Sequence, residues 1–477
     1  MTMVLLATSV AVAQDITELF EKAQEGDAQA QYELGNCYLK GTGIRKDAGK
    51  ALMWYKKAAT QGHEYAKMSA DMLVDMGVAG TESAPAAAEL TPAATTEFDS
   101  SSAENEYREG LRYEEGNGVP KNKLKAFQHF LAAAQQGHAA AQGWVAVYYA
   151  KGEGVKEDLQ ESVRWAKLGA QQDDARAMNC LGVSYLKGEG GLTVNIAEGL
   201  KYIRAAAEKG FAIAQRNLGN DYLNGEIVTK DAVEAVKWYR LAAEQGDAAS
   251  QAALGWCYYK GEGVPQNYTE AVKWLRPAVE QGDDIAQWNL AECYRYGYAV
   301  PKDTAEAVRL YRDSANQGNM YAQRQLGLLY GSGDGVPKDP KESTRWYKLA
   351  ADQGDAISQI NLAVCYELGE GVPQNYAESY RLNKLAADQG EPQALVNLGL
   401  CYYNARGVNK NSEEAFKYFK LAADKDYAKA YHYLGVCYIE GVGVKKNRNE
   451  GIRLLRLAVS RGVSGAKEDL KKIGVKP

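Results

Sequence analysis

Residues 246–281 read GDAASQAALGWCYYKGEGVPQNYTEAVKWLRPAVEQ, and this stretch decides the fold. The same pattern begins again at Gly282, Gly318, Gly354 and Gly390, each 36 residues after the one before. Self-similarity at a period of this size is typical of a solenoid, in which one small supersecondary unit is stacked on copies of itself. We therefore predict that most of the chain is a tandem array of one two-helix unit.

The first helix of the unit, helix A, has a recurring set of residues. Counting the opening glycine as position 0, positions 4, 8, 9 and 12 are Ser250, Leu254, Gly255 and Tyr258 in this copy. Positions 4, 8, 11 and 12 fall on one stripe of a helix with 3.6 residues per turn, which predicts the core face. A glycine inside a helix costs about 0.5–1 kcal/mol relative to Ala. Its recurrence predicts the place where the second helix, helix B, crosses helix A.

A G-x-G-V turn ends helix A, here at Gly261 and Gly263, and an Asp or Asn follows each such turn. These side chains accept hydrogen bonds from the free N–H groups at the start of a helix. We therefore expect them to begin helix B, which carries Ala271 and Trp274 in this copy. The residues are Asp47, Asn122, Asp158, Asn195, Asp231, Asn267, Asp303, Asp339, Asn375, Asn411 and Asn447.

The A-x-x-x-L-G-x-x-Y helix, the G-x-G-V turn, the Asp/Asn cap, the W-x-x-x-A-A helix and the Q-G junction resemble the Sel-one-like repeat (SLR) family. This family is a 36-residue relative of the tetratricopeptide repeat (TPR). The resemblance implies an all-α fold, a right-handed α-solenoid of about eleven SLR/TPR-like helix-turn-helix repeats. It also implies a non-enzymatic scaffold that binds a protein or peptide segment in a concave groove formed by helices A. A fold of this type hosts many partners, so the resemblance names none.

The repeats divide the chain into segments. We predict a short N-terminal SLR block at 14–77, the main solenoid at 103–462 and a C-terminal capping helix at 463–477. Residues 78–102 are rich in Ala, Thr, Ser, Pro and Glu without periodicity, which predicts a linker.

Residues 1–13, MTMVLLATSVAVA, resemble a signal peptide that is truncated at its start. They form an apolar run ending in A-V-A, although the stretch is short and carries no Lys or Arg. We expect a periplasmic or secreted protein. The alternative is a cytoplasmic protein, which unpaired thiols would favour.

Composition and motifs argue against several other functions. The net charge is −5 and no basic tract stands out, so we expect no nucleic-acid partner. No apolar run reaches the roughly 18 residues of a membrane span, so we expect no integral membrane segment in the mature chain. The four histidines lie in different copies without ligand spacing, so we expect no metal site. No cofactor-binding motif is present, and we expect no cofactor and no enzyme.

A hydrolase is the alternative function. Ser184 and Lys187 form an S-x-x-K motif, and cysteine-rich members of the SLR family resemble β-lactamases or peptidoglycan-related, penicillin-binding proteins. Ser184 occupies position 11 on the core stripe, however, and neither S-D-N nor K-T-G accompanies it.

Six of the seven cysteines also occupy position 11: Cys37, Cys257, Cys293, Cys365, Cys401 and Cys437. The cysteine-rich relatives pair one thiol on each helix of a hairpin, and helix B has no Cys here. We interpret these cysteines as small buried apolar residues.

The candidate binding site lies on the helix-A face opposite the core stripe, at positions 3, 6, 10 and 13. Aromatic and Arg residues, which are enriched in binding hot spots, gather there over four middle copies. Asn recurs at position 7, where its amide could hold the backbone of an extended peptide. The predicted binding residues are Arg216, Asn217, Asn220, Trp256, Tyr259, Trp288, Asn289, Glu292, Arg295, Tyr296, Tyr321, Arg324, Asn361 and Asn397.

The alternative is that these aromatic and amide groups pack between copies. We distinguish the two by recurrence: a feature of every copy serves the stack, and a feature of a few copies serves a ligand. The tyrosines at position 12, such as Tyr258, and the tryptophans at position 28, such as Trp274, are therefore assigned to the core.

Overall fold

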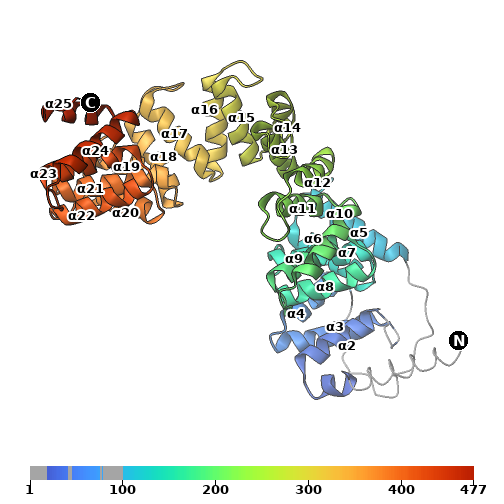
Figure 1. The fold of residues 1–477 in the computed structure, drawn as a ribbon. Helices are drawn as coiled ribbons and strands as arrows, with labels where there is room; N and C mark the ends of the chain where they lie inside the picture. Colours follow the sequence, from blue (N-terminus) through green and yellow to red (C-terminus); the bar gives the residue numbers. More distant parts are fainter. Residues whose placement is uncertain (1–18, 41–43, 45, 76–77, 79–99, 477) are drawn as a thin grey trace. The chain divides into compact units, whose positions relative to one another are not determined.

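A computed structural model describes residues 19–40, 44, 46–75, 78 and 100–476, and within these ranges the regular structure is helical (Figure 1). Two predicted segments, the signal peptide at 1–13 and most of the linker, lie outside the described residues. The division at 14–77, 78–102, 103–462 and 463–477 stays a prediction.

Helices A and B alternate along the chain, as predicted. The helices A are α2 (Ala28–Lys40), α4 (Glu64–Asp75), α5 (Ser100–Glu115), α7 (Ala139–Lys151), α9 (Ala175–Lys187), α11 (Ala212–Asn224), α13 (Ala248–Lys260), α15 (Asp284–Tyr296), α17 (Met320–Ser332), α19 (Ala356–Leu368), α21 (Pro392–Asn404), α23 (Ala428–Glu440) and α25 (Ser464–Lys472). The helices B are α3 (Ala48–Thr60), α6 (Lys123–Gln135), α8 (Leu159–Gln171), α10 (Ile196–Glu208), α12 (Ala232–Glu244), α14 (Tyr268–Glu280), α16 (Thr304–Asn316), α18 (Pro340–Asp352), α20 (Tyr376–Asp388), α22 (Ser412–Asp424) and α24 (Arg448–Ser460).

The predicted Asp and Asn caps are confirmed in all eleven copies. Each begins a helix B, and its side chain accepts from a backbone N–H in the first turn. At the other end of the turn, Gly261 closes α13 in the left-handed conformation with φ +76°. An L-residue with a side chain is strained in that conformation, which explains the glycine.

The glycine inside helix A marks a close contact between the two helices of one copy, as predicted. A Cβ atom on Gly255 would lie 2.7 Å from Cγ of Leu275 on α14. Ala at this place would therefore push the two helices apart, at a cost typical of overpacking.

In many of the copies a buried glutamine at position 5 joins the copy to its neighbour, a feature that the sequence analysis missed. Gln251 on α13 donates to the carbonyl of Ala243 at 3.2 Å and accepts from Gln281 Nε2 at 3.0 Å. Gln323 on α17 repeats this pattern with Ala315 and Gln353. A buried amide must be satisfied in this way, so the residue serves the stack.

The tyrosines at position 12 pack against the apolar core clusters, as predicted, but most of them are not fully buried. Tyr38 and Tyr149 are buried. The other nine are partly exposed: Tyr113, Tyr185, Tyr222, Tyr258, Tyr294, Tyr330, Tyr366, Tyr402 and Tyr438. The tryptophans at position 28 fit better, since Trp54, Trp165 and Trp346 are buried and only Trp238 and Trp274 are partly exposed.

The chain divides into two compact units, residues 1–218 and 219–477, which we describe separately. The division falls inside α11. At the end of the second unit, Ala466 and Leu470 of α25 pack on Leu455 and Ala458 of α24. None of the described helices is long and apolar enough to span a membrane.

Candidate functional site

The predicted binding residues lie on helices A from α11 to α21. Arg216 and Asn217 belong to the first unit and the others to the second. In the second unit, positions 3, 6, 10 and 13 of α13, α15, α17 and α19 form one face of the stack, which we call the helix-A face. Successive copies meet along this face, because side chains of α15 contact those of α17.

The aromatic residues of the helix-A face are partly used in packing. The Trp288 ring lies 5.5 Å from the Tyr321 ring of the next copy, and its Nε1 is enclosed without an acceptor. Trp256 is partly buried against the cluster that contains Tyr239 and Leu254. The alternative of packing between copies therefore holds for the two tryptophans, whereas half of the Tyr321 side chain remains exposed.

A group of four tyrosines lies beside these residues. Tyr298, in the turn after α15, stacks on Tyr268 with ring centroids 4.4 Å apart. Tyr259 meets both rings edge-on, and Tyr296 stacks on Tyr298 at 5.5 Å. Tyr259 and Tyr296 were predicted as binding residues; Tyr268 and Tyr298 were not, because they lie outside helix A.

Both predicted arginines of the second unit are already engaged. Arg295 donates to Gln325 Oε1 of the next copy at 2.8 Å. Arg324 forms an ion pair of 2.8 Å with Asp355, a buried residue that also caps α19. Their charges therefore serve contacts between copies before they serve a ligand.

Asn220 and Glu292, at position 10, are contacted from within their own copy. Asn220 accepts from the Tyr239 hydroxyl at 2.7 Å. Glu292 accepts from the Tyr311 hydroxyl and is only 9% exposed. Burial and this carboxylate raise the pKa of Tyr311, which keeps the phenol protonated as the donor.

The asparagines at position 7 do not form the predicted open row of amides. Asn289 is fully buried and donates to the carbonyl of Ile285 at 2.9 Å. Asn217 donates to Asn179 at 3.0 Å and Asn397 to Asn383 at 2.9 Å. Asn361 is partly exposed. Because Asn289 has no accessible surface, the structure gives no continuous clamp for an extended peptide.

What remains exposed on the helix-A face, and at position 14 beside it, is a row of large apolar side chains. They are exposed by 39–60% and lie at positions 3, 10 and 14 of α15, α17 and α19. The row consists of Ile285, Tyr296, Tyr321, Leu328, Ile357, Val364 and Leu368. Of these, Tyr296 and Tyr321 are among the predicted binding residues. Counting Ile, Leu and Val at positions 3, 10 and 14 would have found the other five.

Ser184 and Lys187, the S-x-x-K motif, are not arranged as a catalytic pair. Ser184 is only 6% exposed, and Lys187 pairs with Glu189 at 3.6 Å. The seven cysteines are free thiols, five of them buried and two partly exposed. Burial raises the pKa of Cys257, Cys293 and Cys437 to about 12, so these thiols are poor nucleophiles.

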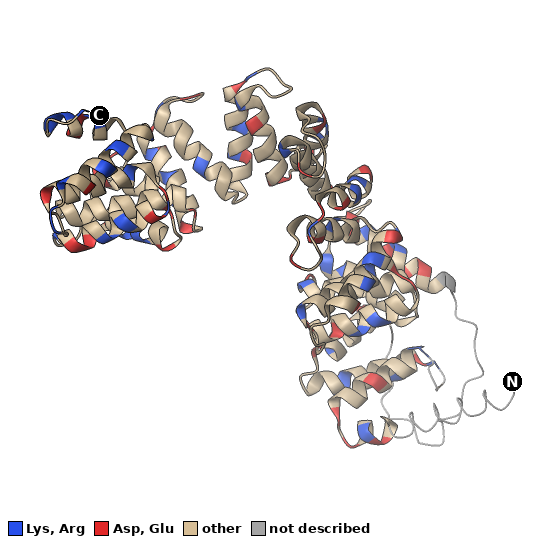
Figure 2. Cartoon of the chain, in the orientation of Figure 1, with Lys and Arg blue, Asp and Glu red and all other residues tan. Residues whose placement is uncertain are grey.

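Charges are interspersed along the helices that the structure describes, as Figure 2 shows. Helix B repeats an acidic residue and a basic residue one turn apart, such as Glu234 with Lys237 at 2.6 Å and Glu450 with Arg453 at 2.6 Å. Among the described residues, no group of three or more His, Cys, Asp or Glu could hold a metal ion.

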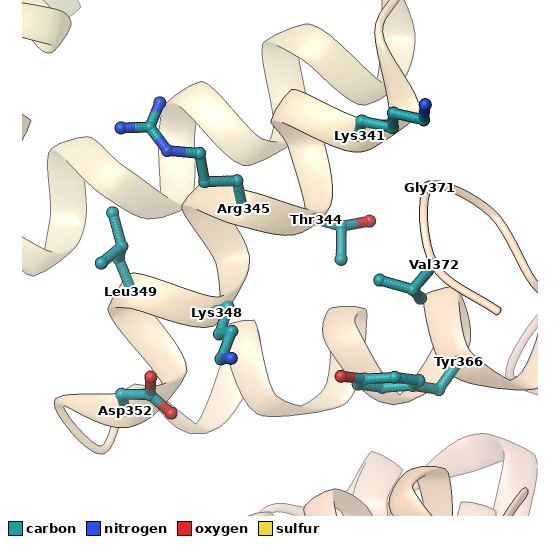
Figure 3. Close-up of a pocket in the computed structure, with 9 residues that line it drawn as sticks. All are labelled: Lys341, Thr344, Arg345, Lys348, Leu349, Asp352, Tyr366, Gly371 and Val372. Atoms are coloured by element: carbon teal, nitrogen blue, oxygen red, sulfur yellow. The ribbon is translucent and has the colours of Figure 1, made fainter. Parts of the chain in front are cut away.

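One pocket of about 410 Å³ lies away from the helix-A face (Figure 3). It is lined by α18 residues, by Tyr366 and by the turn at Gly371 and Val372. Thr344 and Val372 point toward one another, whereas Arg345 points away from them. Arg345 forms an ion pair of 3.0 Å with Glu342, and Lys341, Lys348 and Asp352 also line the pocket.

A family model described as the Sel1 repeat matches eleven segments of the chain. They are residues 28–63, 106–138, 139–174, 175–211, 212–247, 248–283, 284–319, 321–355, 356–391, 392–427 and 428–463. The predicted number of repeats and the predicted resemblance are thereby confirmed.

Two solved structures share these repeats. The first is c5321, a protective antigen present in uropathogenic Escherichia coli strains that displays an SLR fold. It is 31% identical, covers 96% of this chain and 90% of its own, and has a TM-score of 0.62. The second is a Sel1 repeat protein from Oxalobacter formigenes, 32% identical over 65% of this chain and 90% of its own, with a TM-score of 0.47.

A curated relative matches over a short stretch. The DAP3-binding cell death enhancer 1 of Rattus norvegicus is 38% identical over 58 residues, which is 12% of this chain and 11% of that protein. The chain thus spans about a tenth of the length of this relative.

Proposed function

Because the chain belongs to the Sel1 repeat family, we propose that it is a non-enzymatic scaffold that binds a protein segment on the helix-A face of residues 284–368. The all-α repeat fold fits protein interaction, and TPR-like solenoids present long surfaces for it. The partner and the site are the parts of this proposal that need an experiment.

The exposed apolar row carries the proposal. Single apolar side chains on a surface are ordinary, but a contiguous apolar patch marks an interaction site. Here seven large side chains from α15, α17 and α19 form the row. Burying one of them fully against a partner contributes about 1.5–3 kcal/mol.

The polar groups around the exposed apolar row also support the proposal. Arg295 donates to Gln325, Arg324 forms an ion pair with Asp355, and Glu292 accepts from Tyr311. Each group therefore keeps a hydrogen-bond partner within the protein when a ligand covers the row, which limits the cost of desolvation.

A photo-crosslinking residue at position 328 tests the proposal. Leu328 is 44% exposed on the helix-A face, and Leu385, which is 40% exposed on helix B α20, gives a matched control. We expect a specific crosslinked partner from native cells at position 328 and none at 385. Leu328→Lys should lose the partner and keep the free energy of unfolding within about 0.5 kcal/mol. Equal crosslinking at both positions would contradict the proposal.

We also propose that the protein acts in the periplasm or outside the cell. The apolar run of residues 1–13 supports export. Amino-terminal sequencing of the protein from native cells tests it, with a start at Gln14 expected. A chain that retains residues 1–13 in the cytoplasm would contradict it.

A further inference from the structure

The N-terminal block, formed by α2, α3 and α4, contacts α7 and α8 of the same unit. Tyr65 of α4 donates its hydroxyl hydrogen to Asp158 Oδ2 at 3.0 Å. Its ring stands edge-on to Tyr149 with centroids 5.6 Å apart. Tyr65 and Met68 both pack against the apolar cluster built from α6, α7 and α8. The contact joins residues 93 positions apart in the chain.

The surface that the N-terminal block uses is its own helix-A face. Tyr65 and Met68 stand at positions 3 and 6 of a copy that begins at Gly62 and has α4 as its helix A. Tyr32 stands at position 6 of the preceding copy, and Glu161 and Arg164 of α8 lie near enough to act on its phenol. The charge of Arg164 also reaches Lys40, at the end of α2. The helix-A face of this block therefore lies against the outer side of a helix B.

The burial of Tyr149 reflects its contact with the N-terminal block. Tyr149 is 1% exposed. Tyr65 and Phe127, with ring centroids 5.6 and 5.2 Å from that of Tyr149, cover its ring. The tyrosine at position 12, near the end of helix A, is partly exposed in nine other copies: Tyr113, Tyr185, Tyr222, Tyr258, Tyr294, Tyr330, Tyr366, Tyr402 and Tyr438.

The two carboxylate oxygens of Asp158 accept hydrogen bonds from different donors. Oδ1 accepts from the backbone N–H groups of Gln160 and Glu161, both at 3.0 Å, and so begins α8. Oδ2 accepts from Tyr65. An Asn can begin a helix B equally well, as Asn195 does for α10, but it offers an N–H₂ group in place of Oδ2. The Tyr65 hydroxyl can therefore donate to the cap of a helix that begins with Asp, but not to the side-chain N–H₂ group of a helix that begins with Asn.

We propose that the helix-A face of the N-terminal block is a helix-binding surface, that its ligand is an Asp-capped helix, and that α8 fills it in cis. Tyr65 selects the Asp cap, and Met68 contributes apolar contact. A partner helix that begins with Asp competes with α8. This surface lies in residues 28–75, apart from residues 284–368, so the two proposals can fail separately.

The test uses the full chain carrying Asp158→Asn, which weakens the internal ligand and keeps its cap. The probe is a labelled peptide of residues 157–172, EDLQESVRWAKLGAQQ, held helical by a side-chain staple because a helix of this length is marginal in water. A second peptide carries Asn in place of Asp158. We expect the Asp peptide to bind at least about fivefold more tightly than the Asn peptide, since the hydrogen bond goes to a charged group.

Two further proteins complete the test. In Tyr65→Phe/Asp158→Asn the two peptides should bind alike, because the donor is gone and the ring is kept. The wild-type protein should bind the Asp peptide more weakly than Asp158→Asn does, because α8 occupies the surface. Fluorescence of Trp54, which is fully buried in the N-terminal block, checks that the block is folded. Equal binding of the two peptides to Asp158→Asn, or no binding of either, would overturn the proposal.

Discussion

At the scale of single residues, position 10 of helix A shows that a role depends on the residue it meets in helix B. Asn36, Asn220 and Glu292 each accept from a tyrosine at position 29: Tyr55, Tyr239 and Tyr311. Where Leu275 stands at position 29, position 10 is Trp256. In these copies the pairing was visible in the sequence, although the copy at Gly318 has Tyr347 at position 29 and Leu328 at position 10. The pairing was missed because each position was compared with itself across copies and not with its partner.

The Tyr311–Glu292 pair gives a prediction for stability. Tyr311→Phe removes the donor and leaves a buried carboxylate unsatisfied, so we expect a loss of about 1–3 kcal/mol in the free energy of unfolding. Tyr239→Phe is the matched control, because Asn220 is exposed and water can replace the phenol. Urea unfolding of both variants measures the difference. An equal loss in the two would contradict the assignment.

Asp221 gives a prediction for pH dependence. It takes position 11, where six other copies have Cys, and its Oδ2 is buried without a partner. Burial, reinforced by Glu226, raises its pKa from 3.8 to about 6. A folded acid with a raised pKa holds its proton more tightly than the unfolded chain does. Its contribution to stability therefore falls as pH rises from about 4 to about 6, and stays low above that.

Asp221→Cys should remove this loss. We expect the variant to be more stable than the wild type at pH 7.5, by about 1–2 kcal/mol after discounting for partial exposure. At pH 3.5 the gap should shrink. Urea unfolding at both values measures it, and a gap that does not change between them would count against the buried carboxylate.

At the level of secondary-structure elements, the positions of the helices could be predicted from local sequence rules. The contacts between helices could not. The caps from Asp47 to Asn447 and the glycine at position 9 follow from the chemistry of one hairpin, so one copy suffices to predict them. The glutamines at positions 5 and 35 join different helices. Gln251 and Gln281 are 30 residues apart, and nothing local requires either. Only the recurrence of both glutamines in the same copies indicates that they are in contact.

The glutamine contact can be tested on α17. Gln323→Leu leaves the carbonyl of Ala315 without its side-chain donor and removes one of the acceptors of Gln353 Nε2, which still donates to the carbonyl of Gly318. We expect a loss of about 1–3 kcal/mol in the free energy of unfolding. The copy that begins at Gly390 has Leu395 and Lys425 at the two positions. Gln323→Leu/Gln353→Lys copies that natural pair and should recover part of the loss. A double variant no more stable than the single one would contradict this account.

At the scale of the whole molecule, the period predicts the array and leaves its long-range contacts open. Repeats contact their neighbours, so a 36-residue pattern fixes most of the fold. The contact of Tyr65 with Asp158 crosses the predicted linker and joins residues 93 positions apart, so the 36-residue period does not indicate it. The same holds for the candidate site. Recurrence proposed a face, but only the structure shows that Ile285 and Leu328 are exposed there while Asn289 is buried.

The last prediction concerns how firmly the N-terminal block is held on α8. Burial lowers the pKa of Lys40, and the nearby Arg164 lowers it further, so the contact contains two like charges that oppose it. Lys40→Gln removes this repulsion, and we expect slower hydrogen exchange at the backbone amides of residues 149–164. Lys50→Gln is the control, because it also removes one Lys charge from the N-terminal block, here one that lies over the Tyr38 ring. Faster exchange in Lys40→Gln would mean that the ammonium group stabilises the contact. The like-charge repulsion would then not be what limits docking.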